Sequence, residues 1–234
     1  MNKRSTALPR NSAGLAGKAF AVYAKDLQQE LRTRYAVSTI LLFGIAALAM
    51  VSYSLGQSGL PPKMLSALFW VIMFFSSMAG LAQAFIREEE AGTSLALRLN
   101  ADPGAVYLGK LFFNLTLLSA ITIVVTPGFF LFMDAPTDGV GIFVLITFLG
   151  VLALCAATTL VAAIIARAAM KGALFAVVAL PIVIVPMMVL VGAGARALDG
   201  GTLGQVAPEI QVLIAYTVVM VTASYLLFRF VWLE

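Results

Sequence analysis

Histidine is absent from the 234-residue sequence, and cysteine occurs only once, at Cys155. These absences exclude an internal disulfide, zinc coordination by cysteine and histidine, bis-histidine haem ligation and catalysis by a Ser–His or Cys–His pair. Charged residues are also scarce, at 11% of the chain, whereas soluble domains contain about 25%. Because 62% of the residues are hydrophobic, a soluble fold would leave many apolar side chains in water. The composition therefore excludes a soluble globular protein.

Six segments contain no Asp, Glu, Lys or Arg over a length that can cross a bilayer, for which about 20 apolar residues are needed. They predict an all-α integral membrane fold with six transmembrane helices within a single domain over 36–234, and no room remains for a separate soluble domain. The predicted helices lie at about 36–56, 64–86, 111–133, 140–166, 173–195 and 210–232.

The basic residues lie mainly on one side of this predicted bundle. Thirteen of the fifteen Lys and Arg fall in the N-terminal segment, the second and fourth connections and the C-terminal end, which must share one side of a six-span protein. The positive-inside rule then predicts a multi-pass membrane protein with both termini in the cytoplasm. Because these charges flank spans rather than form a free tail, we expect no nucleic-acid partner.

The segment before the first span divides into two parts. Residues 1–14 have the composition of a disordered tail. Residues 15–35 predict an amphipathic helix that lies in the cytoplasmic interface in contact with lipid, although a partly ordered basic anchor that only fixes orientation is the alternative. Its apolar stripe is formed by Phe20, Tyr23, Leu27, Leu31 and Tyr35, and charged or polar residues occupy most other positions.

The connection between the second and third predicted spans is the most informative segment. Three carboxylates, Glu88 to Glu90, follow the membrane exit, then come Leu95, Leu97 and Leu99, and Asp102-Pro103-Gly104 predicts a turn. Apolar anchors with charges at the rim are typical of a short helix that docks on a partner protein. The alternative is that the carboxylates face water and the leucines lie on the lipid surface, and the residues alone leave both open.

Apart from Arg229 near the end of the last one, the predicted spans contain no Asp, Glu, Lys or Arg, whereas ion-coupled carriers usually need an intramembrane carboxylate or a broken-helix site. The chain also lacks the G-x-x-x-x-G-K-[ST] phosphate loop. If ATP drives this protein, a different polypeptide must bind the nucleotide.

Two further features of the spans have alternative interpretations. Pro181 and Pro186 each remove a backbone donor from the fifth predicted helix, so together they favour a hinge, whereas each alone would only bend the helix. The aromatic run from Phe69 to Phe75 could form a polarizable wall for a flat ligand such as haem, but packing against lipid or a neighbouring helix is the favoured interpretation.

The connection at 196–209 is expected to be an irregular extracytoplasmic loop.

The motif Glu90-Ala91-Gly92-Thr93, which follows Arg87, resembles the charged-x-Gly-Thr signature after the second helix of ABC-2 type exporter permeases. The wider layout is similar to the CcmB family, the membrane subunits of the system I haem exporter for cytochrome c maturation. Further segments that resemble this family are 25–35, 76–86, 102–110 and the helix that contains Pro181 and Pro186.

This resemblance implies an ABC permease of the bacterial cytoplasmic membrane without its own ATPase activity. It would pair as a homodimer and bind two copies of a cytoplasmic ATPase, CcmA. ATP and Mg would be bound by that partner, and haem would be the cargo rather than a cofactor of this chain. CcmC, CcmD and the haem chaperone CcmE would be the other partners. A short cytoplasmic coupling helix would contact the ATPase through Arg87, Glu88, Glu89, Glu90, Gly92, Thr93, Leu95, Leu97 and Leu99.

Three other functions remain as competitors. One is a generic ABC-2 exporter for a lipid, drug or polysaccharide, and another is an assembly scaffold that transports nothing. The third is a glutamate-dependent membrane protease that uses Glu88 and Glu89. That pattern needs an arginine four positions after a Glu pair and distant histidines, but Thr93 and Ser94 occupy the possible positions and histidine is absent.

Overall fold

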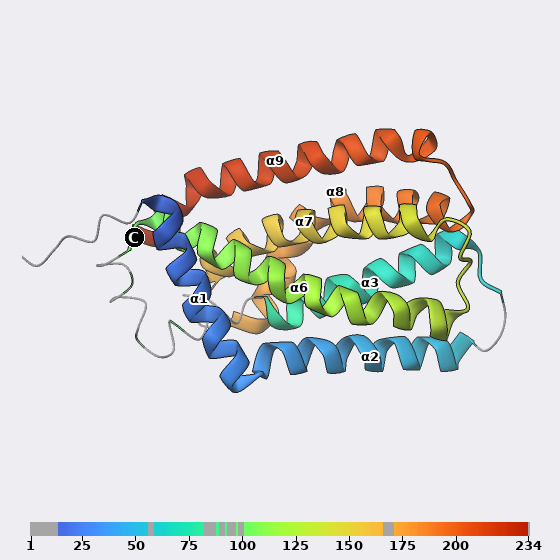
Figure 1. The fold of residues 1–234 in the computed structure, drawn as a ribbon, viewed down its shortest axis with the longest axis horizontal. Coiled ribbons are helices and arrows are strands. Elements are labelled where there is room, and N and C mark those ends of the chain that lie inside the picture. Colours follow the sequence, from blue (N-terminus) through green and yellow to red (C-terminus); the bar gives the residue numbers. More distant parts are fainter. Residues whose placement is uncertain are drawn as a thin grey trace, which may run out of the picture.

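The computed structural model describes residues 14–55, 59–81, 88, 92, 97, 101–165 and 171–233, and every helix or strand in this part of the chain is an α-helix. In this described part six helices form a bundle, and α1 crosses one end of it at a steep angle (Figure 1). The helices are α1 (Leu15–Thr33), α2 (Tyr35–Leu55), α3 (Pro62–Gly80), α6 (Pro103–Met133), α7 (Val140–Ile165), α8 (Lys171–Leu198) and α9 (Leu203–Leu233).

Five of these helices are long and apolar enough to span a membrane, namely α2, α6, α7, α8 and α9. The apolar stretch of α3 is shorter, over Pro62–Met78, and residues 82–86 of its predicted span lie outside the described residues. The structure thus has the character of a helical membrane protein, while the total of six spans stays a prediction.

The core forms where α7 packs against α6, α8 and α9. Of the candidate spans α7 is the most buried and α9 the least. From α3, Phe69 lies 5.1 Å from the ring centres of both Phe129 and Phe143, and Trp70 and Met73 are fully buried. The interpretation that this aromatic run packs against neighbouring helices is therefore confirmed, although Phe75 is exposed.

Two helices begin earlier than the sequence analysis predicted, because their N-termini are capped. Helix α6 begins at Pro103 instead of 111, and the side chain of the N-cap residue Asp102 accepts a hydrogen bond of 3.0 Å from the backbone N–H of Gly104. Helix α9 begins at Leu203 instead of 210. There the Gln205 side chain accepts a hydrogen bond from the backbone N–H of Thr202, as in one half of a capping box.

The connection from α8 to α9 is correspondingly shorter than the predicted loop at 196–209. Helix α8 ends at Leu198 with Gly200 in the left-handed conformation at φ 74°. The backbone N–H groups of Gly200 and Gly201 donate to the carbonyls of Ala197 and Arg196, which is the pattern of a Schellman motif. Only four residues separate the two helices.

Helix α1 turns only part of its apolar stripe to the bundle, where Tyr23 and Leu27 pack against the core. Phe20 and Leu31 are each 67% exposed, whereas Asp26 and Glu30 are buried, together with Ala19 and Val22. Two carboxylates that the sequence places outside the apolar stripe therefore face the bundle. The exposed apolar side chains are suited to a helix that lies along a lipid interface.

The break between α1 and α2 explains the buried Glu30. Arg34 adopts a left-handed conformation at φ 53° between the two helices. The Glu30 carboxylate then accepts a hydrogen bond of 2.9 Å from the backbone N–H of Val37, in the first turn of α2. A negative charge is favourable there, because the first N–H groups of a helix lack intrahelical partners.

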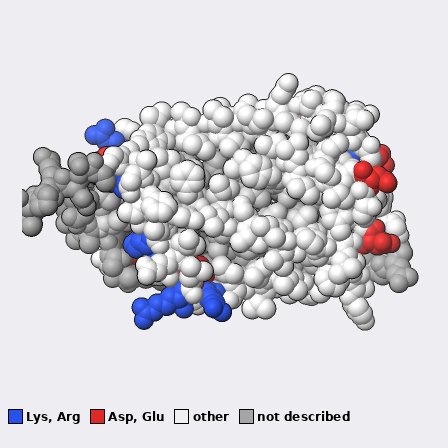
Figure 2. Space-filling model, in the orientation of Figure 1, with Lys and Arg blue, Asp and Glu red and all other residues white. Residues whose placement is uncertain are grey.

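Charged residues on the face shown in Figure 2 lie at the two ends of the molecule. Lys and Arg gather mostly at the end where α1 lies, the larger patches of Asp and Glu lie at the opposite end, and a band almost free of charge separates the ends. Such a band suits the hydrocarbon layer of a membrane, in which ionised side chains are unfavourable.

Candidate functional site

Helix α1 approaches the backbone of α6 closely at Gly109. A Cβ atom at this glycine would lie 2.7 Å from the backbone oxygen of Ala19 and 2.7 Å from the Cβ of Val22. Any larger residue would push the two helices apart. The close approach brings the next residue of α6, Lys110, against the buried face of α1.

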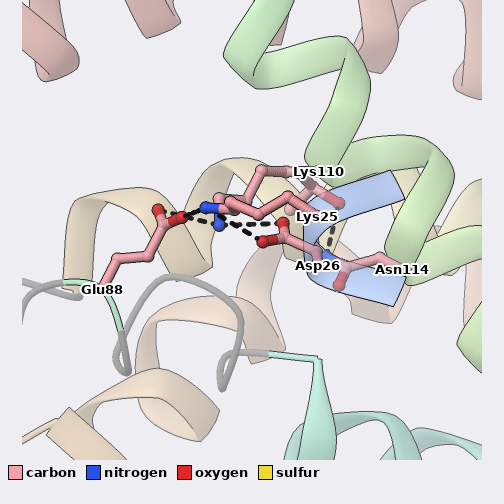
Figure 3. Close-up of polar contacts among 6 residues, drawn as sticks. Lys25, Asp26, Glu88, Lys110 and Asn114 are labelled. Atoms are coloured by element: carbon pink, nitrogen blue, oxygen red, sulfur yellow. Dashed lines mark hydrogen bonds and ion pairs between the residues drawn. The ribbon is translucent and has the colours of Figure 1, made fainter. Parts of the chain in front are cut away.

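Four charged side chains meet at this contact and form a closed ring, which we call the charge ring (Figure 3). Lys110 lies 3.0 Å from Asp26 and 2.8 Å from Glu88. Lys25 lies 3.2 Å from Asp26 and also pairs with Glu88. Positive and negative groups alternate around the ring, and each lysine contacts both carboxylates.

Three of the four members of the charge ring are removed from solvent. The side chain of Lys110 is fully buried and those of Asp26 and Glu88 are 5% and 7% exposed, whereas that of Lys25 is 45% exposed. An unpaired charge is very unfavourable in such a place. Two lysines and two carboxylates make the charge ring neutral, so loss of any one side chain would leave an uncompensated buried charge.

Two members of the charge ring, Glu88 and Lys25, have shifted pKa values. Burial alone would raise the pKa of Glu88, but Lys110 and Lys25 more than offset this effect and hold it below its ordinary value. Burial alone would lower the pKa of Lys25, but Asp26 and Glu88 raise it above its ordinary value. Both groups are therefore charged near neutral pH.

A second polar contact lies one turn further along α6. The amide of Asn114 donates a hydrogen bond of 3.1 Å to the hydroxyl of Thr159 on α7, which itself donates to the carbonyl of Cys155. All three residues are buried. Asn114 thus connects the part of α6 beside the charge ring to the central helix of the bundle.

The structure describes three of the nine residues predicted to contact an ATPase. Glu88 is turned inward into the charge ring, and its contact with an ATPase stays a prediction. Gly92 is exposed with a left-handed φ of 66°. Leu97 is half-buried and packs against the apolar cluster that contains Val106 and Tyr107. This leucine is therefore partly covered by its own chain.

The other six residues of that prediction lie outside the described residues, and the contact stays a prediction. They are Arg87, Glu89, Glu90, Thr93, Leu95 and Leu99.

Four residues of this site were not predicted from the sequence as functional, namely Lys25, Asp26, Lys110 and Asn114. One available signal was Lys110 itself, because a cation at the start of a long apolar run needs a counter-charge. Another was the spacing of Ala19, Val22, Asp26 and Glu30, which places small residues and carboxylates on one helix face. Neither signal identifies which carboxylate meets Lys110.

An integral membrane protein is defined by the long apolar helices and the band almost free of charge. The buried charges lie together at one end of its helical bundle. Over residues 17–230 the chain matches the family described as CcmB protein, and it belongs to that family. Members of this family are membrane permease components of ABC haem-export systems in cytochrome c biogenesis, and the ATPase of such a system is a different subunit. Family and apolar helices together identify an inner-membrane protein. None of the curated proteins compared with the chain matches it.

Proposed function

We propose that this chain couples ATP hydrolysis by a separate cytoplasmic ATPase to the release of a haem-loaded chaperone on the periplasmic side of the membrane. The ATPase would be CcmA, the chaperone CcmE, and CcmC and CcmD would complete the complex. The observation that carries the proposal is the family match, which covers nearly the whole chain. The sequence supports it further, because the chain has no phosphate loop with which to bind ATP itself.

The proposed ATPase contact is the connection that includes Glu88, at the α1 end of the bundle. Glu88 contacts Lys25 of α1, and basic residues gather at this end (Figure 2). The positive-inside rule then favours a cytoplasmic location for this end and for both termini. A cytoplasmic ATPase would reach the connection directly there.

A homodimer suits the proposed complex because ATPase subunits of this kind act as pairs. Two copies of this chain about a twofold axis would present two equivalent connections, one to each ATPase. Bound ATP and Mg would belong to the ATPase, and haem would be the cargo of the whole complex.

Deletion and complementation test the proposal directly. We expect a strain without this chain to lose its c-type cytochromes and to regain them when the chain is supplied on a plasmid. Co-purification from the complemented strain should recover the ATPase with the chain. Normal c-type cytochromes in the deletion strain would overturn the proposal and would favour a generic exporter of another cargo.

A second experiment addresses what the complex moves. The purified complex is placed in sealed vesicles with haem on the side of the ATPase, and the chaperone is placed on the other side. We expect ATP hydrolysis to free the haem-loaded chaperone from the membrane. Free haem that accumulates across the membrane without the chaperone would contradict this step.

A further inference from the structure

We infer that the charge ring positions the ATPase-facing connection relative to α1 and α6, so that Asp26, Glu88 and Lys110 are positioning residues of the coupling step. This inference rests on the proposed function and deepens it. It assigns Glu88 to the interior of the subunit as an anchor, and leaves contact with the ATPase to other residues of the connection.

The first argument is the topology of the charge ring. Its members come from three separate elements: Lys25 and Asp26 from α1, Lys110 from α6, and Glu88 from the connection after α3. Each side chain contacts two neighbours of opposite charge. Displacement of any one element therefore breaks at least two ion pairs, and the three elements are favoured to move together.

The second argument is burial. Water cannot readily replace a broken partner of Lys110, because its side chain is fully buried. If Glu88 moved away only part of the way, Lys110 would lose an ion-pair partner while it is still buried, which is strongly unfavourable. The backbone contact at Gly109 adds a steric constraint, since α1 has no space to slide closer to α6.

The third argument is the length of α6. This helix has 31 residues, which corresponds to about 46 Å at 1.5 Å per residue, more than the hydrocarbon thickness. Lys110 lies near its beginning, and Phe129 near its end packs on Phe69 and Phe143 in the core. A displacement at the charge ring would be carried by one continuous helix to the opposite side of the bundle.

Charge exchange tests the ring without removing any charge from the chain. Exchange of one neighbouring pair, as in K110E with E88K, places like charges beside Lys25 and beside Asp26. Exchange of all four, K25E with D26K, E88K and K110E, restores alternation around the ring. A closed ring therefore predicts that the pair exchange is defective and that the fourfold exchange recovers.

The readout is the amount of ATP hydrolysed per c-type cytochrome formed, measured with the amount of ATPase that co-purifies. We expect the pair exchange to raise this ratio about 3- to 30-fold, in the range of coupling changes produced by single substitutions, while the ATPase still binds. The matched control exchanges the more exposed pair Arg196 and Glu209 at the other end of the chain, as R196E with E209R, and should leave the ratio unchanged. A fourfold variant that inserts normally but keeps the full defect would overturn the inference.

Neutral substitutions keep the inference testable if the exchanged chains fail to fold. We expect Glu88→Gln to raise the ratio of ATP to cytochrome and to retain the bound ATPase, and Glu88→Asp to restore the ratio in part. Glu89→Gln with Glu90→Gln should instead lower ATPase recovery. Loss of the ATPase in Glu88→Gln would overturn the inference, because Glu88 would then be a direct contact.

Failure of the proposed function is distinguishable from failure of this inference. If the proposed function is wrong, deletion of the chain leaves the c-type cytochromes intact. If only this inference is wrong, deletion still abolishes the cytochromes, but Glu88→Gln has a normal ratio of ATP to cytochrome.

Discussion

The hydroxyl of Tyr216 on α9 donates a hydrogen bond of 2.8 Å to the carbonyl of Ile182 on α8. In an uninterrupted helix this carbonyl would accept the N–H of residue 186, but Pro186 has none. A side chain of a neighbouring helix thus satisfies the group that the proline leaves without a partner. Helix α8 continues through Pro181 and Pro186 to Leu198, and the predicted hinge at these prolines stays a prediction.

Replacement of Tyr216 by phenylalanine should destabilise the bundle. We expect a loss of about 1–3 kcal/mol in the free energy of unfolding, because the Ile182 carbonyl would lose its partner in a medium without water. Thermal unfolding of the purified chain in detergent measures the effect. In a Pro186→Ala background the new backbone N–H can bond to Ile182, so Tyr216→Phe should there cost much less. An equal loss in both backgrounds would contradict this assignment.

Replacement of Gly109 by alanine should weaken the contact of α1 with α6. The added Cβ would meet backbone and side-chain atoms of α1 at 2.7 Å, and overpacking of this kind costs about 1–3 kcal/mol. Limited proteolysis within α1 should become faster. Gly141→Ala is the matched control, since nothing lies within 4 Å of a Cβ at that position. Equal proteolysis rates in the two variants would show that α1 is not constrained there.

The charge ring should give the protein a defined dependence on pH. The pKa of Glu88 lies below its ordinary value of 4.5, so its stabilising contribution is complete above pH 4.5 and is lost as the pH falls through the lowered pKa. The pKa of Lys25 lies above 10.5, so its contribution is complete below pH 10.5 and is lost as the pH rises through the raised pKa. Between these limits we expect a constant stability difference between the wild type and Glu88→Gln.

Thermal unfolding in detergent across this pH range measures that difference. It should shrink under acidic conditions, because protonated Glu88 resembles glutamine. A difference that grows as the pH falls below 4.5 would contradict the assignment.

Thiol labelling should show the orientation of the bundle. The only native cysteine, Cys155, is buried, which permits single-cysteine variants in a Cys155→Ser background. We expect Asp138→Cys, at an exposed position beyond α6, to react with a membrane-impermeant reagent added to intact spheroplasts. Lys18→Cys on α1 should react only after the membrane is opened. The reverse pattern would place the charge ring outside the cytoplasm and contradict the proposed ATPase contact.

Local chemistry made several features of this fold predictable. The helix over Leu15–Thr33 and the apolar helix over Tyr35–Leu55 lie close to their predicted positions, because helical periodicity and charge-free length are properties of adjacent residues. The starts of α6 and α9 were placed too late. Absence of charge marks where a helix can enter lipid, whereas the cap determines where the helix begins.

The sequence by itself determined that this protein is helical and membrane-embedded, since long runs without charge have no other stable environment. Its motifs also indicated the family that the comparison then confirmed. Only the tertiary structure decided that Asp26 and Glu88 meet Lys110, and that the bundle-facing side of α1 carries carboxylates. Residues 84 positions apart, such as Asp26 and Lys110, have no local relationship. Their pairing follows from the packing of α1 against α6 and from the high cost of a buried charge without a partner.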